Sequence, residues 1–389
     1  MKLSYYTFFL LLFLLFIACS EDKKTTFNHF SSASDTLIVK TKKQKGDGFF
    51  QIGATTFPFK KVTSEFPYKI KYPKDIDSIE RTLFMPNFKE KKDFYIDIIK
   101  GYSNEKMVFI VDDNNNKDLT DDSVRPMETM DWTSSKKLIK CYYNSSEGTE
   151  IVEDFSWLKI GTSKKNILIG RSDHVSGTFT IASKTYTIIA ADPMNLSFTY
   201  NIHPQLAVIK NQEVELDTIT NSDILKLGEF IKLENTYYKF DHISENGKFI
   251  RLIKEEEFHT KVGTQVGMIA PDFTVVTTNK DTIRSENLHH KTTLIANSCG
   301  CGGDKKSTQA FYDIQAAFQN INILHIDSNI KKTDNGWHID MKNDFNKDFY
   351  NAYRKQYCLR VCFVIDKDNR ITNKFLITDW KTALANSLE

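Results

Sequence analysis

Two cysteines separated by one glycine are the residues of this chain best suited to chemistry. They lie in KTTLIANSCGCGGD, residues 291–304, where an apolar and β-branched run stops at Cys299 and Cys301. A helix is predicted directly afterwards, over 305–319, so both thiols lie near a helix N-terminus. The helix dipole and the unpaired amide groups at such an end favour the thiolate over the thiol. The stretch predicts a reactive dithiol where a buried strand turns into a helix.

A second group of polar side chains occupies the loop VDDNNNKDLTDDS, residues 111–123. Its acidic and amide side chains recur at alternate positions, so that several oxygens could converge on one hard cation. These candidate ligands are Asp112, Asn114, Asn116, Asp118 and Asp122. The spacing resembles the start of an EF-hand-type loop. It departs from that loop because Lys117 replaces the invariant glycine, position 12 is not Glu, and flanking helices are missing. The alternatives are a structural calcium site and a plain polar turn, which Asn and Asp also favour.

The first residues predict an export signal. Lys2 supplies a positive start, and residues 5–17 are almost wholly apolar before the small residue Ala18. This run is too short to span a bilayer comfortably. We expect a signal peptide over residues 1–18, removed from the mature protein.

The sequence LLFIAC, which ends at Cys19, resembles a bacterial lipobox, although Phe16 is an unusual residue at its place. The resemblance implies lipidation of Cys19, with residues 19–35 as a flexible tether. SEDKK after the cysteine resembles the acidic export signal of surface lipoproteins in the Bacteroidetes group. The expected location is the cell envelope, most simply the outer membrane, with a lipid anchor. An ordinary secretory signal with an incidental cysteine is the alternative.

The rest of the chain divides by pattern into two regions. Residues 36–258 alternate short apolar and polar runs separated by turn signals, which predicts an antiparallel β-rich module, a sandwich or small barrel, with two subdomains as one option. Residues 263–389 alternate strand and helix patterns, which predicts an α/β domain. The length of 389 residues fits two or three domains. The overall fold class is α+β multidomain.

Composition excludes one class of partner. The chain has 52 Lys and Arg against 50 Asp and Glu, a net charge of +2. Such a balance gives no electrostatic footprint for nucleic acid. The hydrophobic content of 40% supports packed cores, so the chain is not disordered.

A weak internal repeat supports the prediction of a β-rich module. GFFQIGATTF at 48–57, GTFTIASKTY at 177–186 and GEFIKLENTY at 228–237 share one pattern of Gly, Phe, Thr and a final aromatic residue. Each predicts one hairpin. Chance coincidence is the alternative, because the chain contains 29 Phe and 16 Tyr.

The C-terminal region resembles a known family. APDFTVV from Ala270, the dithiol stretch, and FVIDKDNRI from Phe363 are similar to the thioredoxin-like redoxins. Within them the likeness is to TlpA-like thiol–disulfide oxidoreductases and to the peroxiredoxins of the AhpC-TSA group. It covers residues 263–389, about a third of the chain. The resemblance implies a central mixed sheet flanked by helices, with the redox site where a strand meets its first helix.

Departures from the family pattern shape the expected chemistry. The family carries W-C-x-x-C, whereas here one glycine separates Cys299 from Cys301 and the tryptophan is missing. A disulfide across C-x-C closes a small strained ring, which makes it more oxidising. Arg360 replaces the cis-proline of thioredoxins and matches the arginine that peroxiredoxins place near their cysteine, so it would stabilise the thiolate. The peroxidatic motif itself is absent, which disfavours a peroxidase.

Two further cysteines lie in YCLRVC, residues 357–362. Because the resemblance brings this loop beside the redox turn, Cys358 and Cys362 are candidate resolving thiols. A metal site of four cysteines is an alternative that the C-x-C spacing and export disfavour. His289, His290, His325 and His338 match no ligand spacing and are interpreted as loop or packing residues.

The sequence thus predicts a lipid-anchored, extracytoplasmic thiol–disulfide oxidoreductase that acts on the thiols and disulfides of proteins. It requires no cofactor, with structural calcium as the one optional ion. The alternative is a catalytically degenerate redoxin domain that serves as a surface binding or interaction module.

Overall fold

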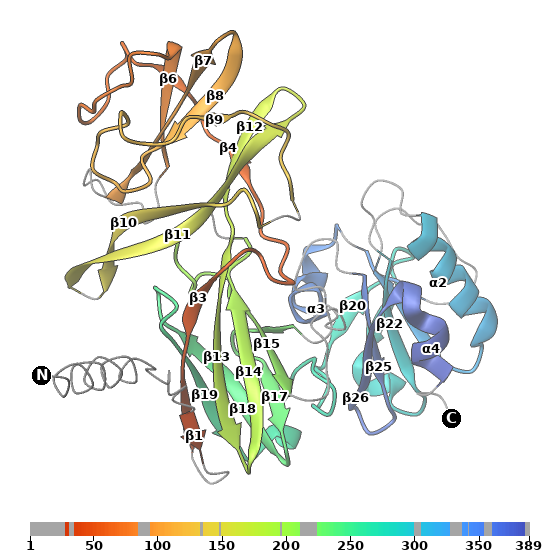
Figure 1. Ribbon diagram of the computed structural model, residues 1–389. Coiled ribbons are helices and arrows are strands. Elements are labelled where there is room, and N and C mark those ends of the chain that lie inside the picture. The colour runs from red at the N-terminus through yellow and green to blue at the C-terminus, as the bar shows by residue number, and fades with distance from the viewer. Residues whose placement is uncertain are drawn as a thin grey trace, which may run out of the picture.

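The computed structural model describes residues 28–30, 35–84, 94–132, 135–147, 149–194, 197–210, 224–298, 305–326, 337–340, 342–353 and 360–385. Cys19, Cys299, Cys301 and Cys358 lie outside the described residues. In the described part the chain is mostly β-sheet, with few helices. Three regions can be followed in Figure 1: an outer β unit at the top, an inner β unit below it, and an α/β region beside the inner unit.

The inner β unit consists of two facing sheets. One has the strand order β1 (Asn28–Phe30), β13 (Asp173–Ile181), β14 (Lys184–Ala191), β15 (Gln205–Lys210) and β16 (Leu225–Lys226), with β3 (Lys42–Lys45) also paired to β13. The other has the order β17 (Phe230–Leu233), β18 (Thr236–Ile243), β19 (Phe249–Glu255) and β2 (Thr36–Lys40). Apolar residues from both sheets form one buried cluster, among them Leu37, Phe179, Ile188 and Tyr238. This is the sandwich architecture that alternating strands predict.

The outer β unit is inserted into the inner one, because its strands lie in the sequence between β3 and β13. One sheet has the order β10 (Ile139–Glu147), β11 (Glu150–Ser163), β12 (Asn166–Arg171) and β4 (Thr55–Thr56). The other has the order β5 (Lys60–Lys61), β6 (Asp77–Phe84), β7 (Ile96–Ser103), β8 (Lys106–Val111) and β9 (Arg125–Pro126). A separate buried cluster joins the two sheets through residues such as Phe84, Phe109, Tyr143 and Leu158.

A buried polar network lies where the two β units meet. Arg171, the last residue of β12, donates hydrogen bonds to the carbonyl oxygens of Thr199 and Asp192, both at 2.8 Å. Its Nε lies 3.5 Å from Asp173 Oδ1, and both side chains are fully buried. Because a buried charge is tolerated only when it is paired and hydrogen-bonded, this network holds the junction in one arrangement.

The α/β region is built on a mixed sheet with the order β24 (Trp337–His338), β23 (Asn322–Ile326), β22 (Thr293–Asn297), β25 (Val361–Ile365) and β26 (Ile371–Leu376). Strands β24, β23 and β22 are parallel to one another. Strand β25 runs antiparallel to β22, and β26 runs antiparallel to β25 and therefore parallel to β22. The helices are α2 (Lys305–Ala317), α3 (Lys347–Tyr353) and α4 (Trp380–Ala385). A hairpin of β20 (Thr274–Val276) and β21 (Thr282–Arg284) precedes the sheet.

Both faces of this sheet are covered, as the consecutive apolar residues Leu294, Ile295 and Ala296 of β22 predict. Leu294 and Ala296 pack with Phe311 of α2 and Leu384 of α4 on one face. Ile295 packs on the other face with residues of α3, Phe349 and Tyr353. A central mixed sheet with helices on both faces is the architecture that the thioredoxin-like resemblance implies.

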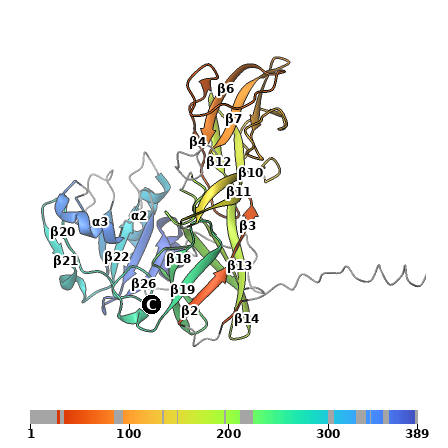
Figure 2. The same cartoon turned by 90° about the vertical axis from the view of Figure 1, so that its left-hand side faces the viewer.

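Specific contacts join the α/β region to the inner β unit. The ring of Tyr237 in β18 stacks on Phe258 in the connecting segment, with centroids 3.8 Å apart. The side chain of Gln265 forms two hydrogen bonds with the backbone of Phe230, at 2.7 and 2.9 Å. Figures 1 and 2 agree that the α/β region lies beside the inner unit and away from the tip of the outer unit.

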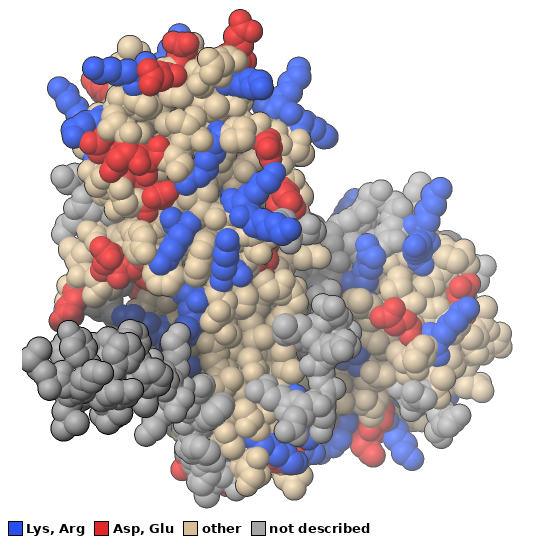
Figure 3. Space-filling view, viewed as in Figure 1, with Lys and Arg blue, Asp and Glu red and all other residues tan. Residues whose placement is uncertain are grey.

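The surface is electrostatically mixed. Basic and acidic residues are interspersed over the face shown in Figure 3, on the outer β unit as well as on the α/β region. This agrees with the balanced composition.

Two of the three predicted repeat hairpins form. Residues 177–186 span β13, a turn and β14, and residues 228–237 span β17, a turn and the start of β18. The prediction for residues 48–57 is wrong. There only β4 is a strand, and it pairs with β12 rather than with its own neighbours.

Candidate functional site

The buried strand β22 ends directly before the predicted dithiol. All five of its residues are buried, and Ser298, which follows it, is fully buried as well. Helix α2 begins at Lys305. Cys299 and Cys301 therefore belong to the connection between a central strand and the helix that covers it, as the sequence predicted. Their own placement lies outside the described residues, so the site is built from what surrounds the strand end.

A hydrogen-bonded row of three side chains crosses the sheet at this end. The parallel register pairs Ala296 with His325, and His325 with His338, so these residues share one face of the sheet. Ser298 lies two residues beyond Ala296 and returns to that face. Ser298 Oγ is 2.8 Å from His325 Nε2, and His325 Nδ1 is 3.0 Å from His338 Nδ1. We call this row the Ser–His–His row.

Phe311 of α2 seals the row from solvent. Its ring stacks on that of His325, with centroids 3.6 Å apart and an interplanar angle of 12°. Ser298, His325 and His338 are 0%, 1% and 7% exposed. Burial lowers the pKa of His325 well below its usual value, and the neighbouring His338 lowers it further. The His325 imidazole is therefore neutral near pH 7.

A neutral imidazole carries one N–H, so His325 donates on one side and accepts on the other. If Ser298 donates to His325 Nε2, then His325 donates through Nδ1 to His338. If His338 donates to His325 Nδ1, then His325 donates through Nε2 to Ser298. Passing from the first state to the second moves a proton along the row when Ser298 receives a proton at one end and His338 Nε2 releases one at the other, so that all three groups are neutral in both states. The row can therefore carry protons between the edge strand β24 and the residue next to Cys299.

Cys362 occupies the same face of the sheet. It is fully buried in the cluster that contains Ala296 and Phe311. Burial raises the pKa of its thiol to about 12, although the backbone amide of Asn297 donates a hydrogen bond that acts the other way. Because thiolate attack needs an ionised and accessible sulfur, this position favours a packing role for Cys362 over the predicted resolving role.

The backbone of Arg360 lies close to the C-terminal end of β22. The antiparallel register pairs Thr293 with Ile365 and Ile295 with Phe363, and the same register continued places Arg360 opposite Ser298. Arg360 is exposed, and its carbonyl oxygen accepts a hydrogen bond from Ile377. Its stabilisation of a Cys299 thiolate stays a prediction.

The five residues of the predicted calcium loop are all described. Asp118 already has partners for both carboxylate oxygens, because Oδ2 pairs with Lys71 at 2.6 Å and Oδ1 accepts from Thr120. Within the described ranges no group of three or more His, Cys, Asp or Glu side chains could hold a metal by itself. Calcium therefore stays a prediction.

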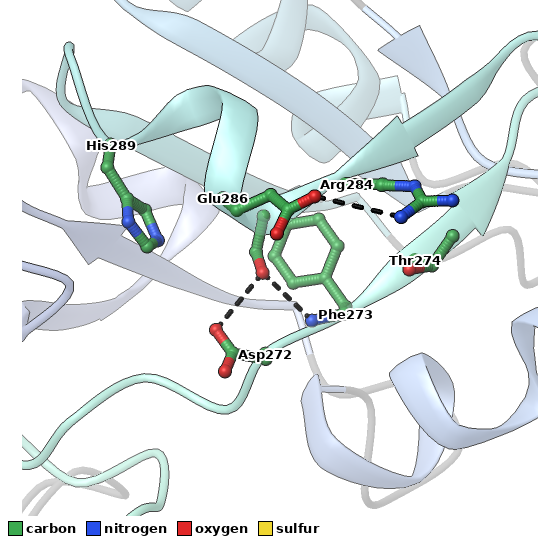
Figure 4. A pocket seen from close by; sticks show the side chains of 7 residues that line it. Asp272, Phe273, Thr274, Arg284, Glu286 and His289 are labelled. Atoms are coloured by element: carbon green, nitrogen blue, oxygen red, sulfur yellow. Dashed lines mark hydrogen bonds and ion pairs between the residues drawn. The ribbon is translucent and has the colours of Figure 1, made fainter.

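A cleft of about 380 Å³ lies at the opposite end of β22, near the segment that leads into the strand. Figure 4 shows Asp272, Arg284, Glu286 and His289 around it. Ser285 donates a hydrogen bond to Asp272 at 3.1 Å, and Arg284 lies 3.7 Å from Glu286. Its lining contains no thiol, and it is separated from Ser298 by the length of the strand.

Sequence reasoning assigned His325 and His338 to loops or packing, and that interpretation missed their mutual contact. The available signal was His325 itself, a titratable residue near the end of the otherwise apolar run INILHI. Its partners could not be read from spacing, because Ser298 is 27 residues away and His338 is 13 residues away.

Membrane attachment is addressed by one observation. Among the described residues no helix is long and apolar enough to cross a membrane. The predicted signal peptide and Cys19 fall outside that part of the chain.

No protein-family model and no curated protein matches the chain. Similar solved structures include the thioredoxin domain of a thiol-disulfide oxidoreductase from Bacteroides vulgatus, at 14% identity and a TM-score of 0.26, over 32% of this chain and 99% of that one. A thiol:disulfide interchange protein from Bacteroides sp. is similar at 14% identity and a TM-score of 0.25, over 30% of this chain and 87% of that one. Copper-bound ScoI from Bradyrhizobium japonicum is similar at 13% identity and a TM-score of 0.22, over 28% of this chain and 90% of that one. Such low values transfer no activity to this chain.

Proposed function

We propose that this protein exchanges disulfides with protein substrates through Cys299 and Cys301. The observation that carries the proposal is the Ser–His–His row, which ends at Ser298, the residue directly before Cys299. Burying polar groups costs free energy unless each of them is hydrogen-bonded, as the members of this row are. The row leads to a motif of two cysteines. The thioredoxin-like topology supports the same reading.

In the reductive direction, the thiolate of Cys299 attacks one sulfur of a substrate disulfide. A mixed disulfide forms, and the other substrate sulfur leaves as a thiolate that takes up a proton. Cys301 then attacks the sulfur of Cys299, releasing the second substrate thiol and leaving a Cys299–Cys301 disulfide. Two electrons and two protons pass to the substrate, and the oxidative direction is the reverse. Cys358 is the alternative resolving thiol.

The Ser–His–His row has a defined part in this scheme. Cys299 must lose a proton before attack, and a leaving thiolate must gain one. The row would relay the first proton from Ser298 towards His338 and relay one back for the leaving thiolate, because neutral His325 can reverse its hydrogen bonds. Arg360 would stabilise the thiolate between the two steps.

We further propose that the chain is exported and anchored by a lipid on Cys19, in the cell envelope and at the outer membrane. The leader pattern of residues 1–19 is the support for this. Cys19→Ser should release the protein from the membrane fraction of the producing cell, and unchanged membrane association would contradict the anchor.

An assay of scrambled-disulfide repair or insulin reduction tests the exchange. The full chain should be active, and Cys299→Ser should lose activity to the background rate, because the attacking sulfur is gone. Cys141→Ala is the matched control. Cys141 is a fully buried thiol of the outer β unit whose pKa burial raises far above the usual value, so its removal should leave exchange unchanged. Equal activity of the full chain and Cys299→Ser would overturn the proposal.

A binding module is the second candidate function. One observation favours it, a cleft of about 810 Å³ in the β units, lined by aromatic and polar side chains that include Phe49, Trp132, Asp47 and His174. Trp132 is 49% exposed, which is unusual for a residue of its size. Titration of the thiols separates the two readings. If the thiols of Cys299 and Cys301 show neither a lowered pKa nor a reversible disulfide, the result favours the binding module.

A further inference from the structure

The loop between β8 and β9 is held in shape by hydrogen bonds from its backbone amides to its own side chains. The backbone amide of Lys117 donates to Asp112 Oδ2 at 3.1 Å, and the amide of Asn116 donates to Asn114 Oδ1 at 3.0 Å. The amide of Asp118 donates to Asn116 Oδ1 at 2.8 Å. Lys117 has a φ of +66°, the left-handed conformation for which EF-hand-type loops use glycine. The lysine at this position therefore leaves the backbone path of such a loop unchanged.

Two carboxylate oxygens of the loop are buried and have no hydrogen-bond partner among the described residues. They are Asp112 Oδ1 and Asp122 Oδ2. Asp112 is 0% exposed, and its carboxylate lies inside the turn because Oδ2 accepts from the Lys117 amide. Buried polar atoms are almost always paired in folded proteins. An unpaired anionic oxygen in such a place calls for a cation or a proton.

Charge counting around the loop gives the same result. Six carboxylates gather here: Asp97, Asp112, Asp113, Asp118, Asp121 and Asp122. Four cations pair with them within 3.5 Å: Arg81, Lys117, Arg125 and Lys71. Six negative charges against four positive ones leave two uncompensated. Within the described part of the chain no ion pair reaches Asp121 or Asp122, and one divalent cation would restore the balance.

We propose that the loop over residues 112–122 binds one calcium ion through Asp112 Oδ1 and Asp122 Oδ2, with the amide oxygens of Asn114 and Asn116 as further ligands. All of these donors are oxygens, which hard cations prefer, and no nitrogen or sulfur donor lies in the set. The site is independent of the thiol chemistry proposed for the α/β region.

Neighbouring groups support this ligand set. Asp121 Oδ2 accepts from the side-chain amides of Asn116 and Asn114, at 2.8 and 3.3 Å, and thereby orients both. Asp118 is left out of the set because the Lys71 ammonium neutralises its carboxylate. The Oδ1 atoms of Asn114 and Asn116 each accept one backbone amide and keep a second lone pair for an ion. The set lacks a bidentate Glu, and the Lys117 ammonium lies 3.5 Å from Asp112 Oδ2. The dissociation constant should therefore lie in the weak range of extracellular modules, about 10⁻⁴–10⁻³ M.

Calcium at this place would stabilise the outer β unit. The carbonyl oxygen of Asp113 accepts from the amide of Tyr142 in β10, at 2.9 Å, and its carboxylate pairs with Arg125 in β9. Leu119 of the loop is fully buried in the cluster around Ile99 and Ile110. An ion that fixes the loop thus fixes a junction between the two sheets of the unit.

The test is calcium binding by the full chain after treatment with a chelator. Isothermal titration with calcium chloride should give a saturable heat for one site, and magnesium at equal concentration should bind more weakly. In 5 mM calcium the melting temperature of the outer unit should rise by about 2 °C or more over that in chelator. No saturable heat and equal melting temperatures would overturn the site.

Two variants separate a ligand role from a merely structural one. Asp122→Asn should abolish the calcium-dependent rise, yet raise the melting temperature in chelator, because it removes a repelled carboxylate. Asp118→Asn, a change of the same chemistry in the same loop, should keep the full rise. A calcium-dependent rise that survives in Asp122→Asn, or vanishes in Asp118→Asn, would contradict the proposed ligands.

Discussion

Two clusters of buried polar groups in this molecule differ in how their hydrogen bonds and charges are satisfied. The Ser–His–His row of the α/β region is neutral, and each contact along it is a hydrogen bond of ordinary length. The loop of the outer β unit is charged, and it keeps two carboxylate oxygens without partners among the described residues. Both clusters lie at the end of a buried strand, β22 in one case and β8 in the other.

The difference indicates what each cluster can exchange with its surroundings. A satisfied neutral row has nothing to gain from an added ion, but it can pass a proton by reversing its hydrogen bonds. A cluster with uncompensated carboxylates binds a proton more tightly than a free carboxylate does, and it also gains from a divalent cation. The first arrangement suits catalysis beside a thiol, and the second suits a structural ion.

The largest effect expected on the neutral row comes from His325→Gln. Glutamine can hydrogen-bond to Ser298 and His338, but it cannot pass a proton between them. The rate of disulfide exchange at pH 7 should fall about a hundredfold, the range of a lost general acid or base. It should recover as pH rises, because hydroxide then removes the thiol proton. The rate profile between pH 6 and pH 9 measures this.

Phe311→Leu is the control for that experiment. It removes the ring that stacks on His325 but leaves the row itself. The melting temperature should fall, while the shape of the pH profile stays that of the unchanged protein. If His325→Gln instead kept the normal profile and lost only thermal stability, the row would be packing alone, and the contrast between the two clusters would disappear.

A smaller effect is expected when the pH of the calcium-free protein is changed. The pKa of Asp122 is about 7 in the folded chain and about 3.9 for an unfolded aspartate. The folded state therefore keeps a proton that the unfolded state has lost, and stability falls as pH rises from about 4 through 7. In chelator, the melting temperature of the unchanged chain should fall relative to that of Asp122→Asn between pH 5.5 and pH 7.5. Calcium should stabilise the unchanged chain more at the higher pH.

Equal pH slopes for the unchanged chain and Asp122→Asn would show that Asp122 titrates normally. His325 adds a slope of the opposite sign to both proteins, because its pKa is well below its usual value in the fold, whereas the unfolded imidazole takes up a proton below about pH 6.5. The difference between the two proteins therefore reports Asp122 alone.

Most of the fold of the α/β region could be predicted from the sequence. The sequence segments 292–296, 321–326 and 362–365 correspond to β22, β23 and β25 to within about one residue. Each is a short apolar run bounded by turn residues, which is a strong signal. The β region was harder, because the insertion of the outer unit between β3 and β13 depends on which strands pair. Pairing is set by tertiary packing, as β4 shows by joining β12.

The candidate sites divide in the same way. Cys299, Cys301 and Asp112 could be identified from residue type and spacing alone. The row of Ser298, His325 and His338 could not, because it exists only through the register of three parallel strands. The burial of Cys362 was also beyond the sequence. An alternating strand shows that one side chain faces a helix, but not that the helix covers it fully.

The central claim is that Cys299 is the attacking thiol at the end of β22. Mass spectrometry of the full chain with Cys301→Ser, reacted with an oxidised protein substrate, tests it most directly. Without its resolving partner, Cys299 should carry the substrate as a mixed disulfide in most molecules. A substrate found on Cys358 or Cys362 instead, or no adduct under conditions that oxidise free thiols, would contradict the account.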